Sequence, residues 1–69
     1  MEKVVAEKLM MELLNLSASM NTVAACIEKI DVEDQKLTLR RSIANMMMAV
    51  YTDLMRPIIR EYPELDPDG

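Results

Sequence analysis

Apolar residues recur through the first thirty positions of the chain at alternating steps of four and three. The series is Leu9, Leu13, Leu16, Met20, Val23, Ile27 and Ile30. Residues spaced in this way share one side of an α-helix, so the pattern predicts an amphipathic helix over about residues 2–30. Polar residues take the opposite positions, as a solvent-facing surface requires.

A second helix is predicted over about residues 33–56, with its own apolar stripe of Leu39, Ile43, Met47, Val50 and Leu54. A tight turn over residues 31–33 separates the two helices. Asp31 is expected to cap the second helix. Glu33 and Asp34 would lie in its first turn, where negative charge favours the helix dipole.

Pro57 lies just beyond this stripe and lacks a backbone N–H, so it cannot bond to the carbonyl group of Asp53. Two outcomes remain open. The second helix either frays here or continues with a kink to about residue 61, and Ile58 favours the second outcome because it would still find an apolar mate.

The two stripes match when the chain folds back on itself over residues 1–60 as an antiparallel hairpin. Residues whose numbers add up to 63 then face one another in apolar layers. These layers are Val5/Ile58, Leu9/Leu54, Leu13/Val50, Leu16/Met47, Met20/Ile43, Ala24/Leu39 and Cys26/Leu37. The predicted fold is therefore all-α, a two-helix hairpin followed by a short extended tail.

The small size of the chain adds a prediction about self-association. The chain has 69 residues, of which 51% are hydrophobic, with one Cys and no His, so neither an internal disulfide nor a structural zinc site can staple it. We expect a homodimer in which two hairpins form a four-helix bundle, with a tetramer of hairpins as the alternative. The core and dimer positions are predicted to be Leu9, Leu13, Leu16, Met20, Val23, Ala24, Ile27, Ile43, Met47, Val50 and Leu54.

Further apolar positions suit a contact between hairpins. Helix one repeats Met10, Ser17 and Ala24 every seven residues, and helix two carries a second stripe of Ala44, Met48, Tyr51 and Met55. In architecture, two helices of this length with a tight turn resemble the small RNA-binding hairpins that control plasmid copy number. No sequence motif carries the resemblance, so it implies a four-helix bundle and no function.

Charge is unevenly distributed along the chain, whose net charge is −4. Residues 1–60 hold eight acids and eight bases, so the last nine residues carry the whole excess. Helix two is locally basic, and an ideal helical wheel groups Arg41, Asn45, Thr52 and Arg56, with Arg60 just beyond. The stripe suits an acidic protein partner or balancing acids better than nucleic acid, because no stacking aromatic accompanies it.

Residues 62–69 form an acidic tail that contains two prolines and cannot extend a helix. The commonest role of such an end is a disordered, solubilising one. The alternative is an extended segment whose Tyr62 and Leu65 dock on a groove while its acids meet the arginines of helix two.

Catalysis and cofactor binding find little support. Without His there is no usual general base, and without an internal Gly there is no phosphate-binding loop. The eight methionines suit packing better than Cu(I), and Cys26 is expected to be inert core filling. We therefore expect no enzyme activity, no cofactor and no metal. The charged N-terminus and short apolar runs predict a cytoplasmic protein without a membrane segment.

The favoured function is that of a non-enzymatic homodimer that binds another protein as a regulator, adaptor or inhibitor. The alternatives are an RNA-binding regulator and a pure oligomerisation module. The residues predicted to contact a partner are Arg41, Asn45, Met48, Thr52, Met55, Arg56, Arg60, Tyr62 and Leu65.

Overall fold

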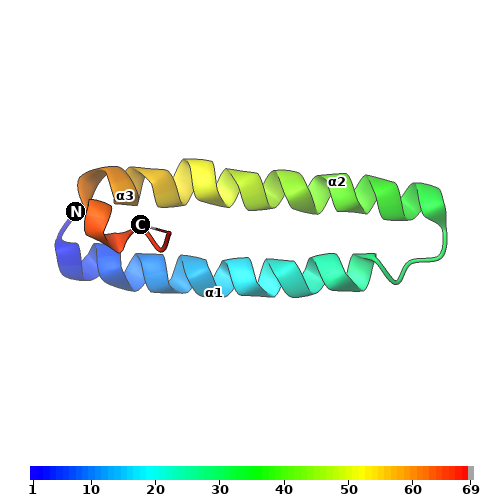
Figure 1. Cartoon of the computed structure of the whole chain (residues 1–69), viewed down its shortest axis with the longest axis horizontal. Coiled ribbons are helices and arrows are strands. Elements are labelled where there is room, and N and C mark those ends of the chain that lie inside the picture. The colour runs from blue at the N-terminus through cyan, green and yellow to red at the C-terminus, as the bar shows by residue number, and fades with distance from the viewer. Residues whose placement is uncertain (69) are drawn as a thin grey trace.

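The computed structural model describes residues 1–68 and shows an antiparallel pair of long helices (Figure 1). Helix α1 spans Lys3–Ile27 and helix α2 spans Glu33–Ala49. The hairpin is a rod of 46 × 19 × 16 Å. No strand occurs in residues 1–68, so the all-helical fold predicted from the sequence is confirmed.

Three short segments follow α2. The π-helical segment η1 spans Val50–Met55 and leads directly into α3, Arg56–Glu61. The 3₁₀ turn η2, Pro63–Leu65, then ends the regular structure. The second arm of the hairpin therefore continues through Pro57 as far as Glu61.

The connection between the arms is longer than the sequence predicted, because α1 ends three residues early. The N–H group of Ile30 donates to the carbonyl of Ile27 at 3.1 Å, a tightened turn that ends the helix. The N-cap residue of helix α2 is Val32, and no side chain caps the helix. The predicted capping role of Asp31 is therefore wrong. Glu33 does lie in the first turn, as expected.

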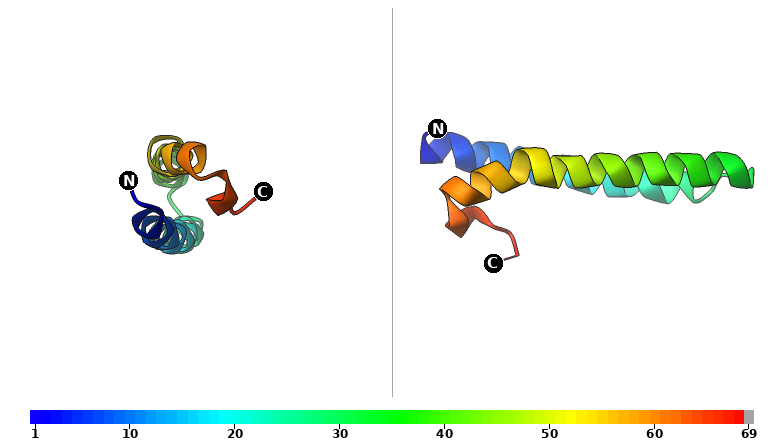
Figure 2. Two further views of the ribbon diagram at one scale, coloured as in Figure 1. Left: turned by 90° about the vertical axis from the view of Figure 1, so that its left-hand side faces the viewer. Right: turned by 90° about the horizontal axis from the view of Figure 1, so that it is seen from above.

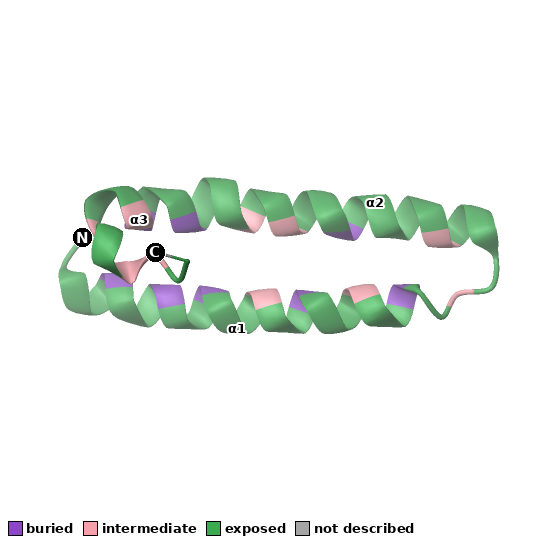
Figure 3. Ribbon diagram, viewed as in Figure 1, coloured by how far each residue is buried: buried purple, intermediate pink, exposed green. Residues whose placement is uncertain are grey.

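The buried face of α1 is one column away from the stripe predicted for it (Figure 3). Leu13, Met20 and Ile27 point inward as predicted, but they do so together with Ala6 and Met10, and with Ser17 and Ala24 half-buried. Several residues predicted to lie in the seam of the hairpin are instead exposed in the single chain, namely Val5, Leu9, Leu16, Val23, Leu37 and Leu39.

The reason is that three neighbouring columns of α1 each repeat every seven residues. They are Leu9/Leu16/Val23, Leu13/Met20/Ile27 and Met10/Ser17/Ala24. The column through Leu13 can form a seam with the large column through Leu16 or with the smaller column through Ser17. The hairpin uses the smaller column, where Ser17 and Ala24 leave room for the side chains of the opposite arm. The larger column is left on the surface.

The second arm shows a related shift at its far end. Its inward residues Ile43, Met47 and Val50 follow the prediction, but the next inward residue is Met55 rather than Leu54. Met55 is 5% exposed and Leu54 is 48% exposed. The step of five residues from Val50 to Met55 is produced by the wide turn of η1.

Pro57 accounts for the position of this wide turn. Its ring would clash with the carbonyl one α-turn earlier, and it has no N–H to offer. The π-helical turn just before it relaxes the backbone, and the N–H group of Arg56 donates to the carbonyl of Tyr51, five residues back. The helix therefore widens instead of breaking.

The core has two parts, which meet at Val50. At the open end of the hairpin the buried cluster is Ala6, Met10, Leu13, Met55 and Ile58, covered by Ile59, Tyr62 and Leu65. Towards the turn it is Met20, Ile27 and Ile43, with Ala24, Ile30 and Met47 packed against it. Within residues 1–68, only the open end has a third segment over the two helices.

Candidate protein-interaction surfaces

Large apolar side chains form one exposed face of the hairpin, which we call the exposed apolar face. Its members are Leu9, Leu16, Val23, Leu39, Met46 and Leu54, which are between 40% and 60% exposed. Leu16, Met46 and Leu54 share the lining of a groove of about 400 Å³, which shows that the two arms contribute to one surface.

Large residues recur along this face as they do in a bundle core. On α1, Leu9, Leu16 and Val23 recur every seven residues, and on α2 Leu39 and Met46 do the same. Smaller residues such as Ser19, Ser42 and Ala49 separate these large residues along the helices. Large and small residues that alternate in this way let the side chains of another helix pair interdigitate.

The groove in this face holds one charged residue. This residue is Asp53, and the remaining lining is apolar and includes Met20, Ala49 and Val50. Grooves of this composition favour an apolar occupant, because most of the surface offers no hydrogen-bond partner.

A different surface runs along the outer side of the second arm, and we call it the basic ridge. It consists of Arg41, Met48, Arg56 and Arg60, all of which are exposed. Within residues 1–68 none of the three arginines makes an ion pair or a side-chain hydrogen bond. The sequence groups the same arginines as a candidate binding stripe, and their contact with a partner remains a prediction.

Two polar members of the predicted stripe contribute less. Asn45 is exposed on the same side of α2. The hydroxyl of Thr52 donates to the carbonyl of Met48 at 2.6 Å, so its hydrogen is used inside the helix. Met55, another predicted contact residue, is buried in the open-end cluster and is not available to a partner in this conformation.

The tail docks on its own hairpin at the open end, on one side of the plane of the two arms (Figure 2). Tyr62 and Leu65 are half-buried against the open-end cluster. The Tyr62 hydroxyl donates to the carbonyl of Met1 at 2.6 Å, and Lys3 Nζ lies 3.1 Å from Glu64 Oε1. The structure thus favours the docked alternative over the disordered one.

Within residues 1–68 the acids of the tail form no ion pair with the arginines of the second arm, so this part of the docked alternative is wrong. Glu64 pairs with Lys3, and Glu61 pairs with the N-terminal ammonium group of Met1 at 3.0 Å. Lys3 shares the column of Met10, on the opposite side of the buried stripe from Leu9. The tail therefore leaves the exposed apolar face open.

Charges in this docking contact shift the ionisation of their neighbours. A hydrogen bond to Glu64 raises the pKa of Lys3 above 10.5. A backbone hydrogen bond, and then the bond to Lys3, lowers the pKa of Glu64 below 4.5. Desolvation by the neighbouring side chains raises the pKa of Tyr62 above 10.0.

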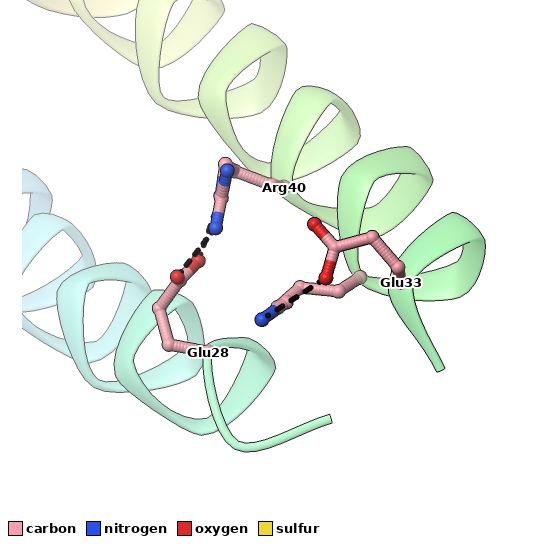
Figure 4. A network of polar contacts seen from close by, with 4 residues as sticks. Glu28, Glu33 and Arg40 are labelled. Atoms are coloured by element: carbon pink, nitrogen blue, oxygen red, sulfur yellow. Dashed lines mark hydrogen bonds and ion pairs between the residues drawn. The ribbon is translucent and has the colours of Figure 1, made fainter. Parts of the chain in front are cut away.

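The opposite end of the hairpin is joined by a bidentate pair between the two arms (Figure 4). Arg40 Nε donates to Glu28 Oε2 at 2.8 Å and Arg40 Nη2 donates to Glu28 Oε1 at 2.6 Å. The hydrogen bond from Arg40 lowers the pKa of Glu28. The sequence interpretation missed this pair, although an acid just before the turn and a base about two helical turns into α2 gave a usable signal.

Cys26 is exposed on α1, which corrects its predicted place in the core. No helix within residues 1–68 combines the length and the apolar character needed to cross a bilayer. Comparison of the chain with protein-family models, with curated proteins and with solved structures gave no match.

Proposed function

We propose that the chain acts as a non-enzymatic homodimer in which two hairpins pack through their exposed apolar faces into a four-helix bundle and bind a further protein. The observation that carries the proposal is the set of six large exposed apolar side chains, three of which line one groove between the two arms. A second copy fits this face because its own side chains alternate in size in the same way.

The surface area of the single chain supports a missing partner. Its accessible surface is 5109 Å². A compact monomer of 7.9 kDa is expected to expose about 4,400 Å². The excess is close to the roughly 800 Å² that each partner buries in an interface of standard size.

The shape supports the same conclusion. The radius of gyration is 14.6 Å. A compact domain of this length has a radius of about 11 Å. Two rods packed side by side would have the cross-section of a four-helix bundle and would bury the surface that makes each rod elongated.

Sedimentation velocity at micromolar concentration tests the dimer, and Leu16 and Leu14 give a matched pair of variants. Both are leucines of α1, 43% and 41% exposed, but only Leu16 lies on the exposed apolar face. We expect the wild-type chain to sediment as a dimer, Leu16→Glu as a helical monomer, and Leu14→Glu as a dimer.

A wild-type chain that stays monomeric at about 100 µM would contradict the proposal, because even an association with a micromolar Kd is populated at that concentration. A Leu14→Glu monomer with an intact Leu16→Glu dimer would move the interface to the other face. Circular dichroism of each variant shows whether its helices are retained, which separates a loss of association from unfolding.

A further inference from the structure

We propose that the basic ridge binds an acidic amphipathic helix of another protein. This inference rests on the protein-binding part of the proposed function and does not depend on self-association. The unpaired cations, their alignment by the π-helical turn and the distribution of carboxylates around them support it.

The chain does not neutralise the ridge itself. Arg41, Arg56 and Arg60 have no acidic partner in the described part of the chain. Asp53 is the only acid between residues 35 and 60, and it lies at the groove on the exposed apolar face. The carboxylates of the tail that form ion pairs do so at the start of α1. The ridge therefore presents three positive charges to an external partner.

The π-helical turn brings these cations into line. In an uninterrupted α-helix Arg60 would sit about 100° around the axis from Arg41. The extra residue in η1 turns everything after it back by about the same angle, so Arg60 and Arg56 come onto the side of Arg41 and Met48. The turn that sends Met55 into the core thus also assembles the ridge.

The ridge matches a helix in both chemistry and length. Arg41 and Arg56 are separated along the axis by about 22 Å, or four turns of helix. Met48 lies between them, 69% exposed, and its flexible thioether side chain suits packing against an apolar side chain. A complementary helix has an apolar residue in its middle and carboxylates near both ends, which arginine binds through its planar fork.

Acidic residues at both ends of the rod disfavour the binding of a nucleic acid along the basic ridge. Asp31, Glu33 and Asp34 lie at the turn, and the acids of the tail lie at the open end. A long polyanion laid along the 46 Å rod would meet carboxylates beyond both ends of the ridge, whereas a helix of four turns fits between them.

The probe is an 18-residue alanine-rich helical peptide, capped at both ends, with a central Leu and two Glu residues near each end. A matched peptide carries Gln in place of every Glu. Binding is followed by NMR at the Met48 methyl group and at the arginine Nε–H groups of the full chain. We expect saturable shifts at Met48 with the Glu peptide and an affinity at least about fivefold lower with the Gln peptide.

Variants locate the contact on the ridge. Arg41→Gln and Arg56→Gln should each weaken binding of the Glu peptide by about fivefold, whereas Lys29→Gln, an equal change in charge outside the ridge, should change it by less than about twofold. Leu16→Glu should bind the peptide like the wild type, whether or not it dimerises. Failure of the dimer is therefore distinguishable from failure of the ridge.

Three results would overturn the inference. The first is equal binding of the Glu and Gln peptides, and the second is the absence of any shift at Met48 at millimolar peptide. The third is tighter binding of an 18-nucleotide single-stranded RNA than of the Glu peptide, with the shifts on the same arginines, which would assign the ridge to nucleic acid.

Discussion

The two ends of the hairpin are built differently, although the same two helices form both. At the open end, five buried residues are covered by a third segment, since Tyr62 and Leu65 of the tail pack across the helices. At the turn end, three buried residues lie between two helices with no other segment of residues 1–68 above them, and one Glu28–Arg40 pair joins the arms.

The comparison shows what two helices alone can bury. Two cylinders meet along a line, so each residue of that line keeps part of its surface in solvent until something lies over the groove. The tail supplies this cover at the open end. The exposed apolar face, on the other side of the two helices, has no such cover among residues 1–68, which is the reason for proposing a second copy there.

The largest expected effect separates the two clusters directly. Ile58 is 1% exposed beneath the tail, and Ile43 is 8% exposed near the turn. Ile58→Ala should lower the free energy of unfolding by about 3–4 kcal/mol and Ile43→Ala by about 2 kcal/mol, measured by urea denaturation at one protein concentration. A greater loss at Ile43 would show that the turn half has a cover of its own in solution.

A smaller loss in the free energy of unfolding is expected when the tail, which covers the open end, is altered. Leu65→Ala removes part of the apolar surface that shields the open end and should cost about 1 kcal/mol. Leu37→Ala, on the exposed surface of α2, should stay within about 0.5 kcal/mol of the wild type. Equal costs for the two variants would indicate that the tail is not held against the hairpin.

Alkaline pH should loosen the open end before the turn end. The pKa values of Lys3 and Tyr62 are raised in the folded chain, so their contributions are full below 10.5 and 10.0 and are lost as pH rises through the raised values. Methyl NMR should show Leu65 moving above about pH 10 while Ile43 stays in place. Simultaneous movement of both methyl groups would contradict the separation of the two ends.

The smallest effect belongs to the pair at the turn. The lowered pKa of Glu28 means that its contribution is present above pH 4.5 and is lost as pH falls through the lowered value. Glu28→Gln should lower the melting temperature by about 2 °C at pH 7 and by nothing measurable at about pH 2. Glu12→Gln, whose partner Lys8 is on the same helix, should have less effect. An undiminished difference at the acidic pH would exclude the charge as its cause.

Much of this architecture could be predicted from apolar spacing. The positions of Leu13, Met20 and Ile27 on one arm, and of Ile43, Met47 and Val50 on the other, follow from the helical period and from the antiparallel fold. The spacing cannot choose between neighbouring columns that are both apolar. Large residues such as Leu16 looked like the better core, but the hairpin buries the column of Ser17 and leaves Leu16 outside.

Departures from the ideal helix were beyond the reach of the pattern. The wide turn before Pro57 adds one residue to the count, which exchanges the places of Leu54 and Met55. The docking of the tail depends on Lys3, which becomes a neighbour of Glu64 only after the hairpin has formed. The grouping of Arg41 with Arg56 could be predicted from an ideal helix, whereas the alignment of Arg60 with them depends on the wide turn.

The wide turn also makes the chain unequally tolerant of changes in length. Deleting one residue from Val50–Met55 would remove the extra residue of the turn, so Ile58 would keep its direction, at the cost of a clash between the Pro57 ring and the backbone of the regular helix. Deleting one residue from the middle of α2 would rotate Val50, Met55 and the whole tail by about 100° away from α1. A single-residue deletion should therefore keep the direction of the tail when it falls in this turn and should misplace the tail when it falls in α2.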